Sequence, residues 1–284
     1  MKPKQIAALH DLSCLGRCAL TVILPTLSVM GYQVVPVPTA LLSTHTGGYT
    51  DMHFRDLTDD MEEIARHFGE LGTTFSSVYT GFLGSTRQIE TVERFLRHFG
   101  SHPDVAVLVD PVMGDEGALY STYTGELASG MRRLSHHANI LTPNLTEACF
   151  LTDTPYLDTA GLSEDEAMDY ANGLMDRLEA QYPCRLVITG ICFSDGGVGN
   201  LGRDADGSRF TVRRPHEGRS YPGTGDVFAS VLLGSLLDGK SFADAVAHAA
   251  DFIALLIRES SKLPTPAREG VALEPQLWRL AKQP

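Results

Sequence analysis

The chain has 284 residues, 43% of them hydrophobic and 20% charged, and its formal net charge is −12 at pH 7. This composition is typical of a globular protein, and the charge argues against nucleic-acid and anionic-membrane partners, which need a basic footprint. No apolar run reaches the length that spans a bilayer, and the first residues lack a long apolar stretch, so we expect a cytoplasmic protein. The five cysteines include no CxxC pair, and we expect them to be reduced.

Short apolar runs alternate with longer amphipathic stretches from one end of the chain to the other. The apolar runs predict strands at 6–9, 33–37, 77–80, 105–109, 140–141 and 186–189. The amphipathic stretches predict helices near 18–30, 57–71, 87–99, 164–181, 226–237 and 242–258. This alternation is typical of right-handed βαβ units, so we expect an α/β fold whose central, mostly parallel sheet is flanked by helices.

One segment departs from the alternation. The runs 198–202 and 208–212 flank an Asp-Gly pair that favours a tight turn, which predicts an antiparallel hairpin late in the sheet. No linker, low-complexity tract or internal repeat is evident in the sequence, so we expect one domain over 1–284.

Polar residues and glycines gather where the predicted strands end. Asp11 and Ser13 follow the first strand, and similar clusters lie at 43–48, 81–84, 110–115 and 142–147. Ligands of such sheets bind beyond the carboxyl ends of the strands. The sequence therefore predicts a binding site at this edge of the sheet.

The segment Gly223-Thr224-Gly225-Asp226 directly precedes an apolar helical run. Two glycines separated by one residue let the backbone approach an anion, and the N–H groups of the following helix point at the same place. A carboxylate there suits a general base that takes a proton from a hydroxyl while the N–H groups hold phosphoryl charge. The alternative is a plain loop in which Asp226 only caps the helix.

Asp110 and Glu147 have both structural and functional interpretations. Asp110 suits a turn cap, or a ligand of Mg²⁺, which needs hard oxygen donors. Glu147 lies three residues after Asn144, and the pair favours a capping box at the start of a helix. Both roles are compatible, because the second oxygen of Glu147 can reach a Mg²⁺-bound water.

His45, Phe82 and the segment 115–120 carry less specific signals. A lone histidine is commonly a structural donor, but the hydroxyl-bearing neighbours of His45 favour contact with a ligand. Phe82 suits either the core or an aromatic wall for a flat heterocycle. The segment 115–120 suits a flap over the site or a plain surface loop. We expect the pair Arg213-Arg214 to be solvated.

Several segments together resemble a known family. Three are similar to the ribokinase-like vitamin kinases: 110–115 (Asp-Pro-Val-Met-Gly-Asp), 141–148 (Leu-Thr-Pro-Asn-Leu-Thr-Glu-Ala) and 223–228 (Gly-Thr-Gly-Asp-Val-Phe). Three more resemble pyridoxal kinases in particular: 31–34 (Gly-Tyr-Gln-Val), 43–49 (Ser-Thr-His-Thr-Gly-Gly-Tyr) and 81–85 (Gly-Phe-Leu-Gly-Ser). The matches follow the family order from about residue 6 to 258, which is more specific than any single motif.

The resemblance implies a ribokinase-like three-layer fold and ATP-dependent phosphorylation of the 5′-hydroxymethyl group of pyridoxal, pyridoxine or pyridoxamine. It implies Mg²⁺ as cofactor, leaves a monovalent cation open, and leads us to expect a homodimer. The implied site residues are the base Asp226; an anion hole of Gly223, Thr224 and Gly225; the Mg²⁺–phosphate residues Asp110, Thr142, Asn144 and Glu147, with Asp110 and Glu147 at the metal; Thr189 by the nucleotide; and Asp11, Ser13, His45, Thr46 and Phe82 in the vitamin pocket.

Two departures from the family pattern lie on the acceptor side. His10-Asp11-Leu12-Ser13 replaces the usual Ser-x-Gln-Ser, so either Asp11 or Ser13 meets the ring, and Phe82 stands where tyrosine is frequent. The nearest alternative is a hydroxymethylpyrimidine kinase of thiamine synthesis, although the segment 45–47 favours a pyridoxal kinase. A sugar or nucleoside kinase is disfavoured because no extra lid strands are evident. A non-catalytic vitamin-binding protein is disfavoured because base, anion hole and acids occur together.

Overall fold

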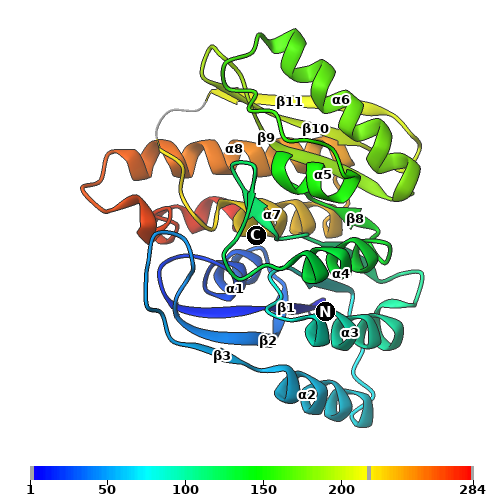
Figure 1. The fold of residues 1–284 in the computed structure, drawn as a ribbon. Helices are drawn as coiled ribbons and strands as arrows, with labels where there is room; N and C mark the ends of the chain where they lie inside the picture. Colours follow the sequence, from blue (N-terminus) through cyan, green and yellow to red (C-terminus); the bar gives the residue numbers. More distant parts are fainter. Residues whose placement is uncertain (1–2, 216–218, 283–284) are drawn as a thin grey trace.

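A nine-stranded sheet forms the centre of the computed structural model, which describes residues 3–215 and 219–282. Its strands are β1 (Gln5–Leu15), β2 (Gln33–Thr44), β3 (Phe54–Asp56), β4 (Ser77–Thr80), β5 (Ala106–Val109), β8 (Ile140–Leu141), β9 (Arg185–Cys192), β10 (Gly197–Arg203) and β11 (Arg209–Pro215). They lie in the order β11-β10-β9-β8-β5-β4-β1-β2-β3 (Figure 1). The strands from β9 to β2 are parallel, whereas β3, β10 and β11 pair antiparallel, which confirms the predicted α/β class and the late hairpin.

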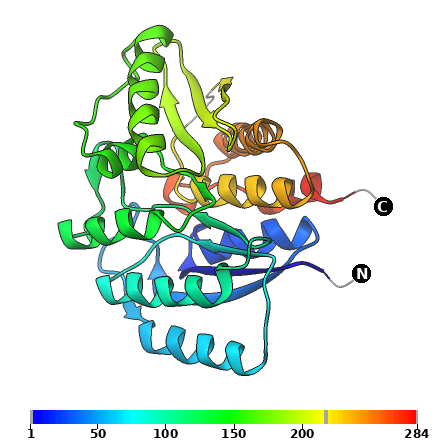
Figure 2. The ribbon, with the colours of Figure 1, turned by 90° about the vertical axis from the view of Figure 1, so that its right-hand side faces the viewer.

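Helices cover both faces of the sheet and give the molecule three layers (Figure 2). One face is covered by α2 (Thr58–Glu70), α3 (Thr86–Phe95), α4 (Gly125–Ser135), α5 (Leu145–Thr152) and α6 (Glu164–Gln181). The other is covered by α1 (Leu20–Val29), α7 (Thr224–Leu237), α8 (Phe242–Ser261) and the short η3 (Glu274–Leu280). Within residues 3–215 and 219–282, no helix is both long and apolar enough to cross a bilayer.

The alternation of side chains along β1 shows how the sheet separates two cores. Ala7 and Leu9 pack into the core beneath α2 to α6, whereas Ile6 and Ala8 pack against the opposite helices. Successive side chains of a strand point to opposite faces, so an uninterrupted apolar run serves both cores at once. This is why the central strands could be predicted from short apolar runs.

The structure corrects the predicted end of the first strand. β1 continues to Leu15, because it keeps pairing with β2 beyond a bulge between His10 and Leu12. Asp11 and Ser13 therefore lie within the strand and not after it. Their polarity resembles that of a loop because this part of β1 borders the binding site.

Short elements without a strong sequence pattern were not predicted. They include α4, the edge strand β3, the short η3, and a two-stranded hairpin made by β6 (Gly114–Asp115) and β7 (Ala118–Leu119). The hairpin occupies the segment expected to be a flap or a plain loop. The N–H of Gly117 at its turn donates to Oγ1 of Thr146 at 2.9 Å, which ties the hairpin to the start of α5.

Candidate active site

A cavity of about 820 Å³ opens at the carboxyl ends of the parallel strands. Its lining includes the first turn of α7 and residues 45–47 of the connection between β2 and β3. Every residue that the sequence assigned to the site lines this cavity: Asp11, Ser13, His45, Thr46, Phe82, Asp110, Thr142, Asn144, Glu147, Thr189, Gly223, Thr224, Gly225 and Asp226.

Asp226 lies in the first turn of α7, with its side chain 12% exposed to the cavity. Its Oδ2 accepts the N–H of Ala19 at 2.8 Å and the thiol of Cys18 at 3.5 Å. The N-cap of α7 is Gly223, so the interpretation of Asp226 as a simple cap is wrong. Burial raises the pKa of the Asp226 carboxyl above its ordinary value, which makes it a better proton acceptor near neutral pH.

The residues before Asp226 line the cavity at the start of α7. Gly223 has a φ of +78°, and a Cβ there would lie 2.1 Å from the carbonyl oxygen of Arg17, so the turn requires glycine. The first helical hydrogen bond of α7 runs from the N–H of Val227 to the carbonyl of Gly223 at 3.1 Å. The N–H groups of Thr224 and Gly225 precede it and lack helical partners, as an anion hole needs.

Asp110 and Glu147 form the acidic side of the cavity, and both are buried. Oδ1 of Asp110 accepts the hydroxyl of Thr142 at 3.0 Å. Burial, and then the charge of Asp226, raises the pKa of Asp110 to about 8. Burial, and then the charge of Asp110, raises the pKa of Glu147 well above its ordinary value. Two buried carboxylates that disfavour each other's ionisation suit a site whose ligand brings positive charge.

Glu147 has the capping role that its spacing from Asn144 predicts, and its role at Mg²⁺ stays a prediction. The capping box is present, with Glu147 N–H to Asn144 Oδ1 at 2.8 Å and Asn144 N–H to Glu147 Oε2 at 2.9 Å. Oε1 accepts the N–H of Met113 at 3.1 Å. The carboxylate is thus held rigidly while it lines the cavity.

The donor set fits Mg²⁺ bound mainly through phosphate and water. No three His, Cys, Asp or Glu side chains of the described residues are arranged to hold a metal by themselves. Mg²⁺ keeps several waters and usually takes one or two carboxylates together with substrate phosphates. Asp110 and Glu147, beside the helix N-terminus of α7, match that limited role.

His45 and Phe82, which the family resemblance assigns to the acceptor pocket, both line the cavity. Nδ1 of His45 accepts the N–H of Gly47 at 3.0 Å, so Nε2 carries the proton and donates to the carbonyl of Arg268 at 2.6 Å. Both nitrogens are thereby engaged with the backbone, and burial lowers the pKa of the ring. Phe82 is 9% exposed, with its ring edge-on to Tyr123. The pocket therefore offers aromatic surface here.

Asp11 and Ser13 face the cavity from the same stretch of β1. The hydroxyl of Ser13 donates to Oδ2 of Asp11 at 2.8 Å. Burial is the main cause that raises the pKa of Asp11 to about 7, with a smaller contribution from the charge of Asp226. Since both side chains line the cavity, which of them meets the acceptor ring stays a prediction.

Arg214 also faces the cavity, which the sequence analysis missed. It is the single lysine or arginine among the described lining residues, and it pairs with Asp251 of α8. Its neighbour Arg213 points to the other face of β11 and pairs with Glu164 and Asp195. The alternation of a strand separates such neighbours, and the pair directly follows the predicted strand 208–212, which continues to Pro215 in β11.

The comparisons with known proteins agree with this geometry. Residues 19–268 match the model of the phosphomethylpyrimidine kinase family. The chain belongs to this family. It is 29% identical over 281 residues to the pyridoxine/pyridoxal/pyridoxamine kinase of Bordetella avium, covering 93% of this chain and 89% of that one. It is 25% identical over 262 residues to the hydroxymethylpyrimidine/phosphomethylpyrimidine kinase of Haemophilus influenzae, covering 89% and 91%.

Solved structures resemble this member of the phosphomethylpyrimidine kinase family over nearly its whole length. A Bacteroides thetaiotaomicron protein assigned to the phosphomethylpyrimidine kinases and crystallised with pyridoxal has a TM-score of 0.89 at 40% identity, covering 98% of this chain and 96% of its own. The pyridoxal kinase of Lactobacillus plantarum has a TM-score of 0.87 at 29% identity, covering 98% and 97%. The Leishmania donovani pyridoxal kinase, bound to ADP and pyridoxamine, reaches 0.78 at 26%, covering 98% and 95%. The chain is thus a kinase of the pyridoxal and hydroxymethylpyrimidine phosphate kinase family.

Proposed function

We propose that the chain transfers a phosphoryl group from ATP to the 5′-hydroxymethyl group of a B6 vitamer and forms the 5′-phosphate. One observation carries the proposal: a single cavity joins Asp226 to the aromatic wall at Phe82 and to the acids Asp110 and Glu147. Base, acceptor wall and phosphate side then share one space, as in-line phosphoryl transfer needs. The Bacteroides protein crystallised with pyridoxal supports a B6 vitamer as the acceptor.

The mechanism follows from how the side chains are held. Asp226 takes the proton of the acceptor hydroxyl through Oδ1, because Oδ2 is held by Ala19 and Cys18. The N–H groups of Thr224 and Gly225 stabilise the charge of the transferring group. Asp110 and Glu147 would hold Mg²⁺ with its waters. When bound, this ion neutralises phosphate charge.

Hydroxymethylpyrimidine is the second candidate acceptor. It too is a flat heterocycle with a hydroxymethyl group, and the Haemophilus influenzae relative is named for it. The aromatic wall and the base suit both rings. The other residues on the acceptor side, and not those on the phosphate side, therefore decide which of the two rings is bound.

A single screen tests the proposal. The purified protein is incubated with ATP, Mg²⁺ and either pyridoxal, pyridoxine, pyridoxamine or hydroxymethylpyrimidine, and ADP release is measured at several acceptor concentrations. We expect a higher kcat/KM for at least one B6 vitamer than for hydroxymethylpyrimidine. The reverse order supports the second candidate. Thermal stabilisation by a vitamer without ADP release indicates a binding protein.

A further inference from the structure

Gln88 is a buried amide at the third position of α3, where the glutamine of a capping box bonds back to the N-cap residue. Ser85, the N-cap, accepts the N–H of Gln88 at 3.3 Å. In a capping box the glutamine would return a bond to the N–H of Ser85. Its Oε1 instead accepts the N–H of Gly84 at 2.7 Å, and the residue is 0% exposed. The bond thus goes to the residue before the N-cap, and not to the N-cap itself.

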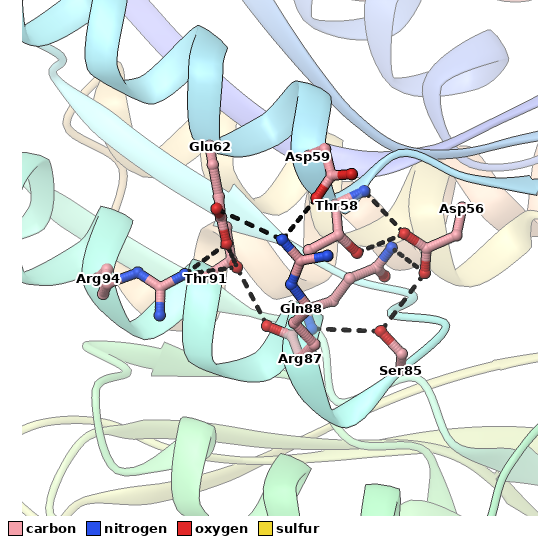
Figure 3. Close-up of polar contacts among 9 residues, drawn as sticks. All are labelled: Asp56, Thr58, Asp59, Glu62, Ser85, Arg87, Gln88, Thr91 and Arg94. Carbon is pink, nitrogen blue, oxygen red and sulfur yellow. Dashed lines mark hydrogen bonds and ion pairs between the residues drawn. The ribbon is translucent and has the colours of Figure 1, made fainter.

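The other end of the Gln88 amide reaches the two strands β2 and β3 at the base of the connection 45–53. Nε2 donates to the carbonyl of Thr39 in β2 at 2.7 Å. It also donates to Oδ2 of Asp56 at the end of β3 at 3.1 Å (Figure 3). β2 and β3 are antiparallel partners, with Ala40 opposite Asp56. One amide group therefore spans the base of the β2–β3 hairpin and the loop before α3.

Both segments held by Gln88 carry walls of the pocket. The hairpin connects through residues 45–53 and contributes His45 and Thr46 to the cavity, and the loop contributes Phe82. The two segments also touch directly. The hydroxyl of Thr39 donates to the carbonyl of Phe82 at 3.2 Å.

We propose that Gln88 is a positioning residue that sets the separation between the two walls of the acceptor pocket. It does not line the cavity itself, so it acts through Gly84, Thr39 and Asp56. The identity of the ligand between the walls rests on the proposed function. The nucleotide side of the cavity, built from α5, α7 and β9, makes none of these contacts, so the effect is specific to the acceptor.

Neighbouring ion pairs supply a matched control. Arg87 and Arg94 of α3 pair with Asp59 and Glu62 of α2, respectively (Figure 3). All four side chains are at least partly exposed. These pairs join α2 to α3 without touching the pocket walls. Arg87→Gln therefore perturbs the same helix start while leaving the buried amide in place.

The test compares Gln88→Leu with Arg87→Gln in the full chain. We expect Gln88→Leu to raise the acceptor KM roughly tenfold while the ATP KM stays within about twofold, because misplaced walls weaken one substrate only. Hydrogen exchange should become faster in peptides covering 81–85 and 45–53. Arg87→Gln should change neither the acceptor KM nor the exchange rates of these peptides. Parallel rises in both KM values, or unchanged exchange in a folded Gln88→Leu protein, would overturn the proposal.

A second pair of variants applies if Gln88→Leu does not fold. Gln88→Glu keeps the acceptor for Gly84 but turns its second oxygen toward both the carboxylate of Asp56 and the carbonyl of Thr39, and adding Asp56→Asn restores a donor on the Asp56 side alone. We expect Gln88→Glu to raise the acceptor KM and to speed exchange in peptides covering 81–85 and 45–53, and the double variant to recover part of both losses. A folded Gln88→Glu protein with the acceptor KM and exchange rates of the unmodified protein contradicts the proposal. If the unmodified protein phosphorylates no vitamer or pyrimidine, the proposed function fails. The exchange data still decide whether Gln88 holds the two segments.

Discussion

The backbone N–H of Ala19 donates a 2.8 Å hydrogen bond to Oδ2 of Asp226, 207 positions later in the chain. Ala19 has a φ of +50°, in the left-handed region that non-glycine residues rarely adopt. The chain accepts this conformation just before α1, where it directs an N–H at the proposed base. One carboxylate oxygen is thereby fixed, and the other is left for the acceptor hydroxyl.

Asp226→Asn should lower kcat by roughly 10²–10⁴ with little change in the ATP KM. The amide oxygen can still accept the N–H of Ala19, but it cannot take a proton. Because burial disfavours the charged form of Asp226, the melting temperature should not fall. Steady-state kinetics tests the lower kcat, and thermal melting tests the unchanged melting temperature. Asp206→Asn, at an exposed residue, is the control. Near-normal turnover would contradict the role of Asp226 as base.

Asp110→Asn should raise the Mg²⁺ concentration for half-maximal activity, by roughly tenfold if the carboxylate helps to hold the ion. The amide oxygen can still accept the hydroxyl of Thr142, and the variant removes a buried charge next to Asp226 and Glu147. We therefore expect an unchanged or higher melting temperature without Mg²⁺. A lower melting temperature with an unaltered Mg²⁺ titration would assign Asp110 a structural role.

Phe82→Ala should affect stability and acceptor binding together, since Phe82 belongs to the core and also lines the cavity. Truncation of a buried phenylalanine costs roughly 3–5 kcal/mol of stability. Loss of aromatic contact with the acceptor should add a several-fold rise in its KM, corresponding to about 0.5–1.5 kcal/mol. Phe82→Tyr keeps the ring and should be mild. An acceptor KM unchanged in the folded fraction would exclude stacking on Phe82.

Asp11→Asn should flatten the pH dependence of stability between about pH 4 and pH 7. Burial raises the pKa of Asp11 from 3.8 to about 7, so the folded state binds the proton more tightly than the unfolded state. The stabilising contribution is full below the unfolded value and is lost as pH rises through the folded one. Asparagine removes this loss, which should raise the melting temperature at pH 8 by a few degrees relative to the unmodified protein. Melting curves at pH 5 and pH 8 check this, and an unchanged slope would contradict it.

The sequence was sufficient for the parallel strands of the sheet, which follow from local patterns, and for the site residues that the family resemblance implied, all of which line the cavity. Apolar runs identify strands buried on both faces, and polar residues after them identify the functional edge. The capping box of Asn144 and Glu147 is also local, since both partners lie within one helical turn. The pair formed by Ala19 and Asp226 could not be predicted, because no local pattern links residues so far apart.

The roles of Arg214 and Gln88 depend on which way a side chain turns. Arg214 faces the cavity only because β11 places it opposite to Arg213. Gln88 follows the spacing of a capping box, yet its amide bonds to Gly84 and Thr39. Tertiary contacts determine the direction of both side chains, and a single sequence does not specify the strand register or the packing that creates these contacts.

The close approach of Gly223 to the carbonyl of Arg17 joins one segment that is translated early to another that is translated late. The acids of the site, including Asp110 and Glu147, are translated before the turn that carries Asp226. A nascent chain released before this turn carries Asp110 and Glu147 but neither the proposed base nor the N–H groups of α7. Phosphoryl transfer by the proposed route therefore requires synthesis to proceed at least as far as α7.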